Sequence, residues 1–265
     1  MNKLYVKHRL ATSAIAGPIS VLREVVERFH TMRYPELGLL HREPWMMNAL
    51  LPRLVRRDSH CLDIGGHIGS VSYMLRKLAP QGSLTIVEAS PEKAGWLRQR
   101  FPTDTVHEVA VSNQRGEISF FENLTNAGYS SLTARESRGQ IREIRVTCTR
   151  IDDLLDETAK VDFIKIDVEG HEYEALCGAR NLLDRCKPVI LFEAGSSSDA
   201  DIAESANTNV FRLLSEDLDY EIYAIFDLYF GRGPIDLAQF AIYRSYPYIA
   251  FNYIALPRGM TLPTG

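Results

Sequence analysis

Five short runs rich in β-branched and aliphatic residues constrain the fold of this chain most. They cover residues 60–64, 83–88, 106–111, 161–167 and 188–194, and segments of helical character separate most of them. Short apolar runs that alternate with helices are typical of parallel strands joined by crossover helices. The sequence therefore predicts an α/β fold in which helices cover both faces of a mostly parallel sheet.

The segments around these runs complete the predicted architecture. Helices are expected at 70–78, 91–101 and 172–185, and Ser90 followed by Pro91 is a favourable helix start. Two further strands are expected at 220–226 and 250–256, which brings the principal strands to seven. Residues 19–57 predict two helices, and residues 117–123 and 142–149 predict an inserted antiparallel pair. The polar loop between that pair, 124–141, is a candidate lid.

Composition excludes several classes of protein. The chain has 265 residues with a formal net charge of −4, so no basic surplus favours a nucleic-acid partner. No apolar run approaches the length of a membrane span, and the four cysteines lack zinc-binding spacing. The apolar stretch after Lys3, Lys7 and Arg9 is too short and too interrupted for a secretory signal, so a cytoplasmic protein is expected.

A glycine-rich turn directly after the first predicted strand is the strongest site motif. Asp63 ends the strand, and Gly65, Gly66, His67 and Gly69 lead into the next helix. Glycines allow a tight turn and a close approach of the backbone to a ligand. An acid before the glycines repels a pyrophosphate but suits a ligand with a cationic amine, such as S-adenosylmethionine (SAM).

Comparison with the dinucleotide motif supports the same ligand. A G-x-G-x-x-G fingerprint ending at Gly69 requires glycine at position 64, where the chain has Ile64. Glu88 ends the second predicted strand, where an acid can accept hydrogen bonds from ribose hydroxyls. Ala110 follows the third strand, where an adenine edge is expected to lie. These residues predict an adenosine-type site, with an NAD-dependent enzyme as the disfavoured alternative.

A second group of ionisable residues follows the fourth and fifth predicted strands. Lys165, Asp167, Glu169 and His171 occupy one short segment, and Glu193 ends the next strand. The carboxyl ends of parallel strands meet at one edge of a sheet, so these residues are expected to converge beside the cofactor. They are candidates for the base that deprotonates an acceptor, or for ligands of a divalent cation such as Mg²⁺, although no definite metal ligand is assigned. A buried Lys165–Asp167 ion pair and a helix cap at His171 are the structural alternatives.

Taken together, these motifs resemble the FkbM family of SAM-dependent methyltransferases. The resemblance runs through residues 63–69, 87–88, 129–132, 149–152, 164–170 and 191–193. It implies a Rossmann-like class I methyltransferase fold with sheet order 3-2-1-4-5-7-6 and an antiparallel seventh strand. It also implies O-methylation of a hydroxyl on a sugar, glycoside or polyketide-type natural product.

The resemblance also assigns expected roles to residues. Asp63, Gly65, Gly69 and Glu88 would hold SAM, and residues 165–170 would face the methyl group and the acceptor. The family often has Ala or Gly and Asn where Gly66 and His67 stand, so His67 is expected to alter the lip of the SAM pocket.

The resulting expectation is an N-terminal helical extension, 1–57, that packs on a SAM-binding methyltransferase domain, 58–265, with the hairpin and loop inserted at 117–149. The partner is a small-molecule or glycan acceptor. N-methylation and a SAM-binding scaffold without turnover remain open as alternatives. The aromatic residues of the last 45 positions or so indicate either an acceptor pocket, the core or a homodimer interface.

Overall fold

The structure is a computed structural model that describes residues 3–13, 37–123, 141–195 and 205–262. Its main sheet has seven strands in the order β3-β2-β1-β7-β8-β10-β9. The strands are β1 (Cys61–Ile64), β2 (Leu84–Val87), β3 (Thr105–His107), β7 (Phe163–Ile166), β8 (Val189–Glu193), β9 (Tyr220–Ala224) and β10 (Asn252–Pro257). Strand β10 runs antiparallel to both of its neighbours, β8 and β9, and the pairs among the other strands are parallel. The predicted class I methyltransferase sheet and its order are confirmed.

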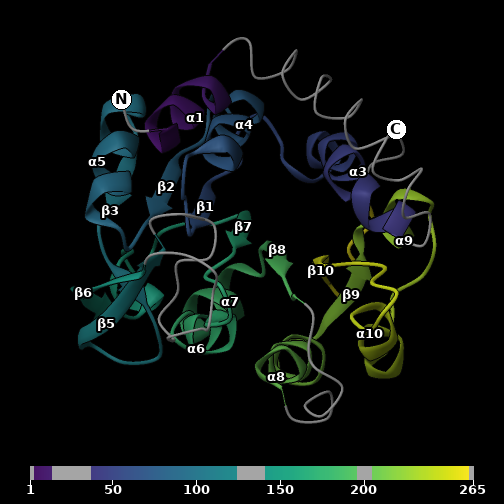
Figure 1. Ribbon diagram of the computed structural model, residues 1–265. Coiled ribbons are helices and arrows are strands. Elements are labelled where there is room, and N and C mark those ends of the chain that lie inside the picture. The colour runs from purple at the N-terminus through teal and green to yellow at the C-terminus, as the bar shows by residue number, and fades with distance from the viewer. Residues whose placement is uncertain (1–2, 14–36, 124–140, 196–204, 263–265) are drawn as a thin grey trace.

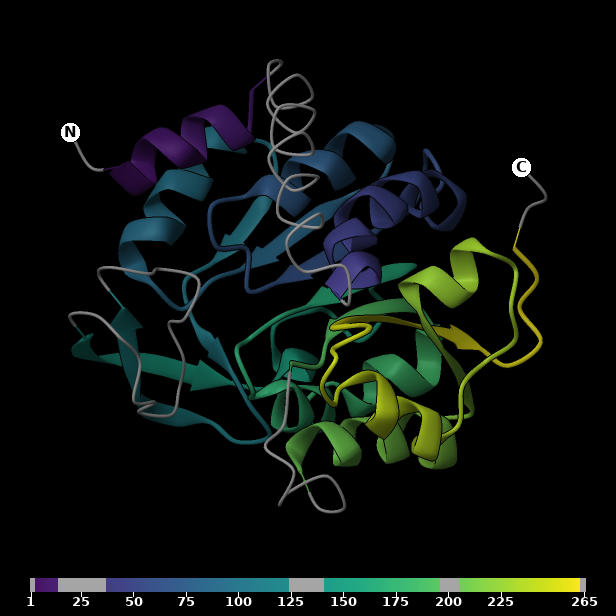
Figure 2. The same cartoon turned by 45° about the vertical axis from the view of Figure 1, so that its right-hand side comes forward.

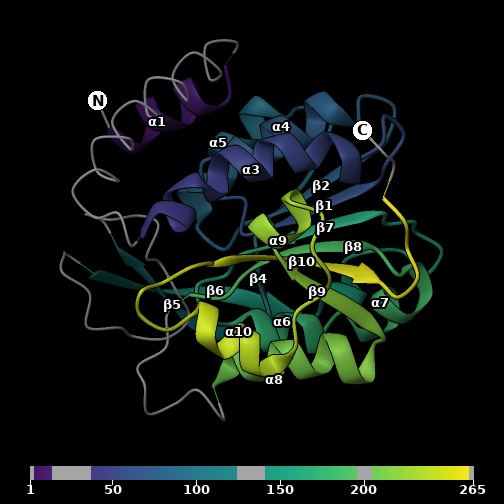
Figure 3. The ribbon, with the colours of Figure 1, turned by 90° about the vertical axis from the view of Figure 1, so that its right-hand side faces the viewer.

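Helices lie on both faces of this sheet, as the strand–helix alternation predicts (Figure 3). The helices are α1 (Lys3–Ala11), α3 (Gly38–Leu54), α4 (Ser70–Leu78), α5 (Pro91–Arg100), α6 (Glu172–Cys177), α7 (Arg180–Cys186), α8 (Ala206–Arg212), α9 (Ile225–Tyr229) and α10 (Leu237–Tyr243), with a 3-10 turn at Ile151–Asp153 and a π-helical turn at Leu213–Asp217. In the views of Figures 2 and 3, α1, α3, α4 and α5 cover one face, and α6, α8 and α10 cover the other. Across the described parts of the chain, none of these helices has the length and hydropathy that crossing a bilayer requires.

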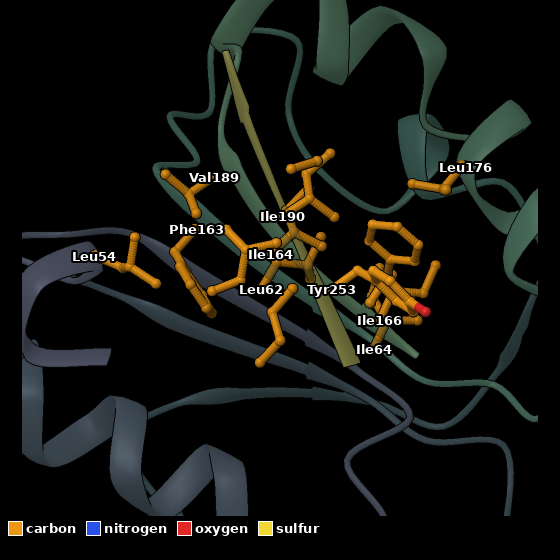
Figure 4. Packing of buried hydrophobic residues seen from close by; sticks show 14 of the residues in the cluster. Leu54, Leu62, Ile64, Phe163, Ile164, Ile166, Leu176, Val189, Ile190 and Tyr253 are labelled. Atoms are coloured by element: carbon orange, nitrogen blue, oxygen red, sulfur yellow. The ribbon is translucent and has the colours of Figure 1, made fainter. Parts of the chain in front are cut away.

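The core is built from the central strands and the helices packed on them. Figure 4 shows Leu62 and Ile64 of β1 beside Phe163, Ile164 and Ile166 of β7, and all five are nearly inaccessible to solvent. Strands that are buried on both faces are mostly apolar along their length. This explains why apolar and polar residues do not alternate regularly in these strands.

The N-terminal extension shares this core. Leu54 of α3 belongs to the same buried cluster as β1 and β7, and α3 packs against α9. Helix α3 begins at Gly38 and ends at Leu54, shortly after Pro52, within the stretch 19–57 where two helices were expected. Helix α1 precedes that stretch, and residues 19–36 lie outside the described residues.

Two predicted elements were wrong because each divides in two. The run 106–111 forms β3 in the main sheet and then β4 (Ala110–Val111), which joins a separate sheet. The helix expected at 172–185 breaks after Cys177, because the carboxylate of Asp152 accepts hydrogen bonds from the backbone N–H groups of Asn181 and Leu182 and so starts a new helix, α7. The run 220–226 stays a strand only to Ala224, where α9 follows.

The inserted antiparallel pair is confirmed. Strands β5 (Gly116–Asn123) and β6 (Ile141–Thr149) pair along their length, and β4 adds to β6 to give a three-stranded sheet in the order β4-β6-β5. This small sheet lies below β3 in the view of Figure 1. Residues 124–140 of the candidate lid lie outside the described residues.

Candidate active site

A cleft opens at the carboxyl ends of β1, β2 and β7. Its walls come from the glycine turn after β1, the end of β2, the segment after β7, helix α5 and the small sheet with the residue before it. Its lining residues are Ile64, Gly65, His67, Val87, Glu88, Ala89, Lys93, Val109, Ala110, Val111, Phe120, Asp167, Val168 and Glu169. Open α/β sheets bind ligands at this position.

The first glycine of the turn is required by close backbone contact. Gly65 has φ +78°, and a Cβ at this position would lie 1.9 Å from the carbonyl oxygen of Asp167. The N–H groups of Gly65 and Gly66 both donate to the carbonyl oxygen of Val87, at 2.9 and 3.0 Å. A Cβ on Gly66 would approach the Ile86 side chain to 2.5 Å. The turn therefore joins three strand ends and leaves no room for larger residues.

The end of the turn is supported from behind by the N-terminal helix. Gly69 is the N-cap of α4 and also has φ +78°. His8 of α1 donates from Nδ1 to the carbonyl oxygen of Ile68 at 2.9 Å. Burial lowers the pKa of His8, although the hydrogen bond to Ile68 opposes the shift. The neutral ring is therefore part of the wall behind the glycine turn.

Glu88 has the geometry of a ribose-binding acid. It is 5% exposed and lines the cleft. Its Oε2 accepts from the backbone N–H of His67 at 2.7 Å, and its Oε1 accepts from that of Ser90 at 2.9 Å. A carboxylate offers about four acceptor sites, so both oxygens retain capacity for hydroxyl donors from a ligand. The residues of the cleft thus fit the adenosine part of SAM.

Asp63 lies beneath the cleft rather than in its lining. Its carboxylate is fully buried, Ser72 donates a hydroxyl hydrogen bond to Oδ2, and Nζ of Lys165 lies 3.6 Å from Oδ1. Asp63 was expected to hold SAM, and in the structure its charged neighbour is Lys165. Asp63 instead holds Lys165, which explains why a buried acid precedes the glycines.

Lys165 is the cation at the centre of the site. Its Nζ donates to the carbonyl oxygen of Gly65 at 2.8 Å and lies 3.4 Å from Oδ2 of Asp167. Burial alone would lower the pKa of Lys165, but the charges of Asp167 and Asp63 outweigh it and raise that pKa. Lys165 therefore stays protonated and orients its neighbours, and it is not available as a base.

Asp167 and Glu169 both line the cleft, so the structure brings these two predicted residues to the cofactor site. The segment that carries them is held by a residue that the sequence reasoning missed. Glu172 accepts at Oε1 from the backbone N–H groups of Val168 and Gly170, at 3.0 and 3.1 Å. It follows Gly170 by two positions in the same motif, so an acid two residues after a glycine turn was the available signal.

Glu193 ends β8 one strand away from Asp167. Burial, and then the negative charges of Asp167 and Glu169, raise the pKa of Glu193 to about 8. The opposing influence of Lys165 is smaller. Glu193 thus belongs to the same electrostatic cluster as the cleft acids, and its carboxyl group titrates close to neutral pH.

His171 lies outside the cleft lining, as do the predicted residues Asp63, Lys165 and Glu193. Its Nε2 lies 3.2 Å from the hydroxyl oxygen of Ser112, and its Nδ1 lies 3.5 Å from a carboxylate oxygen of Glu174. It is absent from the cleft lining, and its side chain makes no capping hydrogen bond at the start of α6. The C-cap residue of α6 also lies against this part of the chain, since a Cβ on Gly178 would approach the carbonyl oxygen of Ser112 to 2.1 Å.

Two lining residues were not anticipated. Phe120 of β5 reaches the cleft from the small sheet, and Lys93 of α5 contributes a mostly buried cation. Glu122, also on β5, accepts from the hydroxyl group of Ser90. This contact connects the small sheet to the loop after β2. The sequence predicted a strand at 117–123 but gave no indication of which residues would contact that loop.

Binding of a divalent cation was one of the two candidate roles for the ionisable residues after the fourth and fifth strands. Over residues 3–13, 37–123, 141–195 and 205–262, no three His, Cys, Asp or Glu side chains come together as a metal site requires.

The sheet order and the cleft define a class I SAM-dependent methyltransferase. The model of the "Methyltransferase FkbM domain" matches residues 63–222, and the chain belongs to this family. The match begins at the acid of the glycine turn and ends in β9, so it covers the cleft and the cluster around Glu193.

Several known proteins are similar to this chain. "Methyltransferase 1" of Beauveria bassiana (strain ARSEF 2860) is 22% identical over 167 residues, which cover 54% of this chain and 67% of that protein. The crystal structure of methyltransferase FkbM from Methylobacillus flagellatus KT is 17% identical with a TM-score of 0.47, and the match covers 76% of this chain but 44% of that one. The plantazolicin methyltransferase BpumL in complex with SAH is 15% identical with a TM-score of 0.42, over 97% of both chains.

Proposed function

We propose that this protein transfers the methyl group of SAM to a hydroxyl oxygen of a sugar, a glycoside or a polyketide-type natural product. The observation that carries the proposal is a group of acids at the carboxyl ends of β7 and β8: Asp167 and Glu169 line the cleft, and their charges act on Glu193 at the end of β8. A hydroxyl group must lose its proton as it is methylated, and this group of acids supplies an acceptor for that proton.

The chain's own residues divide the work of binding. Glu88 accepts hydrogen bonds from ribose hydroxyls, and Ala110 and Phe120 form the apolar walls for the adenine ring. The N–H groups of the glycine turn are held by Val87, so the turn itself is rigid before a ligand arrives. SAM, when bound, supplies an electrophilic methyl group on a sulfonium centre.

Glu193 is the proposed general base. A carboxylate with a pKa near 8 is a stronger proton acceptor than an ordinary carboxylate, and half of it is ionised at about pH 8. Asp167 contributes a negative charge that Lys165 partly neutralises at 3.4 Å. Lys165 thereby keeps Asp167 fixed at the edge of the cleft while Glu193 exchanges the proton.

This arrangement favours oxygen over nitrogen as the acceptor atom. A neutral amine is already a good nucleophile and needs little help from a base. An alcohol is a weak nucleophile until a base removes its proton. A buried acid with a raised pKa has a purpose in O-methylation that N-methylation does not require.

The direct test uses SAM with a deuterated methyl group. Purified protein is incubated with methyl glycosides, hydroxylated polyketide lactones and matched amino sugars, and mass spectrometry locates the label. We expect label on oxygen, and Glu193→Gln should lose it while the exposed control Glu117→Gln keeps it. Label on nitrogen would assign the chain to N-methylation, and binding of SAM without any transfer would favour a scaffold.

Cofactor identity is tested separately by thermal unfolding with SAM, S-adenosylhomocysteine and NAD. A ligand at about a hundred times its dissociation constant should raise the midpoint by roughly 5–10 °C for a chain of this size. A rise with SAM or its product alone supports the proposal, and a rise with NAD alone would overturn it.

A further inference from the structure

Arg244 is a buried cation close to the end of the strand that carries Glu193. It is the C-cap residue of α10 and is 1% exposed. Its Nε donates to the carbonyl oxygen of Gly195 at 3.0 Å. Gly195 follows Glu193 by two residues, so the guanidinium group lies at the carboxyl edge of the sheet where the acceptor is expected.

The two terminal nitrogens of this guanidinium group have no hydrogen-bond partner. Among the described residues, Nη1 and Nη2 of Arg244 are buried and unpaired. Their neighbour is an apolar surface, since the guanidinium carbon lies 5.0 Å from the centre of the Phe240 ring. Within the described parts of the chain, the guanidinium group thus meets a ring face but no acceptor for the hydrogen bonds of Nη1 and Nη2.

Among the described residues, Arg244 also has no counter-charge. Burial lowers the pKa of Arg244, and among these residues the Tyr253 hydroxyl, which donates its own hydrogen bond to the carbonyl oxygen of Ala250, opposes the shift. No carboxylate of the described residues acts on the pKa of Arg244. The acids of the active site act instead on Glu193 and Lys165.

Burying an arginine without a partner is strongly unfavourable, and folded proteins rarely leave such a group unsatisfied. The planar fork of a guanidinium group matches two oxygens of a carboxylate or a phosphate. A ligand with such a group would supply both the missing hydrogen-bond acceptors and the missing negative charge.

We propose that Arg244 is the anion-recognition residue of the acceptor site, and that the acceptor carries a carboxylate or phosphate group in addition to its hydroxyl. The proposal rests on the proposed function, because it places the methylated hydroxyl at Glu193. Two extended residues span at most about 7 Å of backbone between Glu193 and Gly195, so a small molecule such as a sugar acid or a sugar phosphate is long enough to carry both groups.

The burial of Arg244 has a kinetic consequence for this binding. Its terminal nitrogens have no contact with solvent, so an anion reaches them only when the neighbouring chain moves aside. Binding of the anion is therefore expected to be coupled to a local opening near α10, and to be slower than diffusion allows.

The test is thermal unfolding of the full chain in sodium acetate, sodium phosphate or sodium chloride at equal ionic strength, without SAM. We expect the midpoint of the wild type to rise in a saturable way, by roughly 5–10 °C at a hundred times the dissociation constant, with acetate, phosphate or both, relative to chloride. A rise with acetate alone identifies a carboxylate acceptor, and a rise with phosphate alone identifies a phosphorylated one. No rise with either anion would overturn the proposal.

Arg244→Met separates recognition from a structural role. It removes the charge but keeps the volume, so in chloride its midpoint should equal or exceed that of the wild type, and its response to anions should vanish. Arg244→Lys keeps the charge without the fork and should respond more weakly than the wild type. A clearly lower midpoint of Arg244→Met in chloride would show that an internal partner already satisfies the guanidinium group, and would overturn the proposal.

The same variants distinguish this proposal from the proposed function. Arg244 does not line the SAM cleft, so Arg244→Met should keep the full rise with SAM. If SAM produces no rise in any variant, the methyltransferase proposal fails while the response to anions is still measurable. Once an acceptor pair is in hand, Arg244→Met should raise KM about 10- to 100-fold for a uronic acid and leave the matched neutral glycoside unchanged.

Discussion

Nζ of Lys165 donates a hydrogen bond to the carbonyl oxygen of Gly65 at 2.8 Å, and so binds the end of β7 to the glycine turn after β1. The same ammonium group lies between Asp63 and Asp167. A single buried cation therefore connects the turn that holds the cofactor with the acid that faces the cleft. Changes at this residue should affect the fold and the cofactor site together.

Lys165→Met should lower the free energy of unfolding by about 3–5 kcal/mol, because it leaves the carboxylate of Asp63 buried without its counter-charge. Urea unfolding measures this loss. Lys160→Met is the matched control, since Lys160 is exposed and its change should stay within about 0.5 kcal/mol. Equal stability of the two variants would contradict the role given to Lys165.

Gly65→Ala should disrupt the cofactor turn. The added Cβ would lie 1.9 Å from a backbone oxygen of Asp167, and the positive φ is unfavourable for alanine. We expect a loss of about 2–4 kcal/mol in stability and a loss of the thermal response to SAM. Gly95→Ala in α5 is the control, because nothing lies within 4 Å of its Cβ and alanine favours a helix.

Glu88→Ala should weaken SAM binding by at least about 10-fold, because hydrogen bonds from hydroxyls to a charged acceptor are lost. Isothermal titration calorimetry with SAM measures the affinity, and circular dichroism checks that the fold is kept. Glu88→Gln, which retains one acceptor oxygen, should have an intermediate affinity. Unchanged affinity in both variants would remove Glu88 from the ribose site.

The rate of methyl transfer should rise with pH until about pH 8. Glu193 accepts a proton only when it is ionised, and burial together with Asp167 and Glu169 raises its pKa to about 8. We expect kcat/KM to increase about tenfold per pH unit below that value and then to level off. Glu193→Gln should lose the rise and about 10²- to 10⁴-fold of the rate. A wild-type profile that is flat between pH 6 and 9 would exclude Glu193 as the base.

Stability should show the opposite trend at the same residue. Folding raises the pKa of Glu193 from the ordinary glutamate range to about 8, so its neutral form stabilises the fold most fully at low pH. This contribution is lost as pH rises from about 4.5 through about 8. Glu43 also has a pKa raised by burial, to about 7, and contributes in the same direction. The difference between the wild type and Glu193→Gln at each pH isolates the part that belongs to Glu193.

The sheet could be predicted from the sequence because its central strands, β1, β7 and β8, are short, mostly apolar and almost fully buried. The same reasoning failed at 106–111, where one apolar run serves two sheets. Nothing in the residues themselves marks the change of partner between His107 and Ala110, which tertiary pairing with β6 decides. The break after Cys177 depends in the same way on Asp152, a residue distant in sequence.

The candidate site was predictable where side chains follow strand ends and not where they turn away. Glu88, Asp167 and Glu169 reach the cleft because the carboxyl ends of β2 and β7 meet there. His171 follows Glu169 by two residues, but its ring lies against the hydroxyl group of Ser112 and not in the cleft. Asp63 was expected to contact a ligand. The residue pattern of β1 does not indicate that the ammonium group of Lys165 lies beside the Asp63 carboxylate.

The helix behind the glycine turn provides an optical signal for the cofactor site. The ring of His8, which holds Ile68, lies 5.9 Å from the ring of Trp96, and Tyr5 lies 5.5 Å from the same indole. The chain has two tryptophans, and Trp45 is 46% exposed whereas Trp96 is 9% exposed. Fluorescence from the protected indole can therefore be separated from that of the exposed one by a soluble quencher. Trp96 would then serve as an intrinsic fluorophore for the state of the turn, without any label attached to the protein.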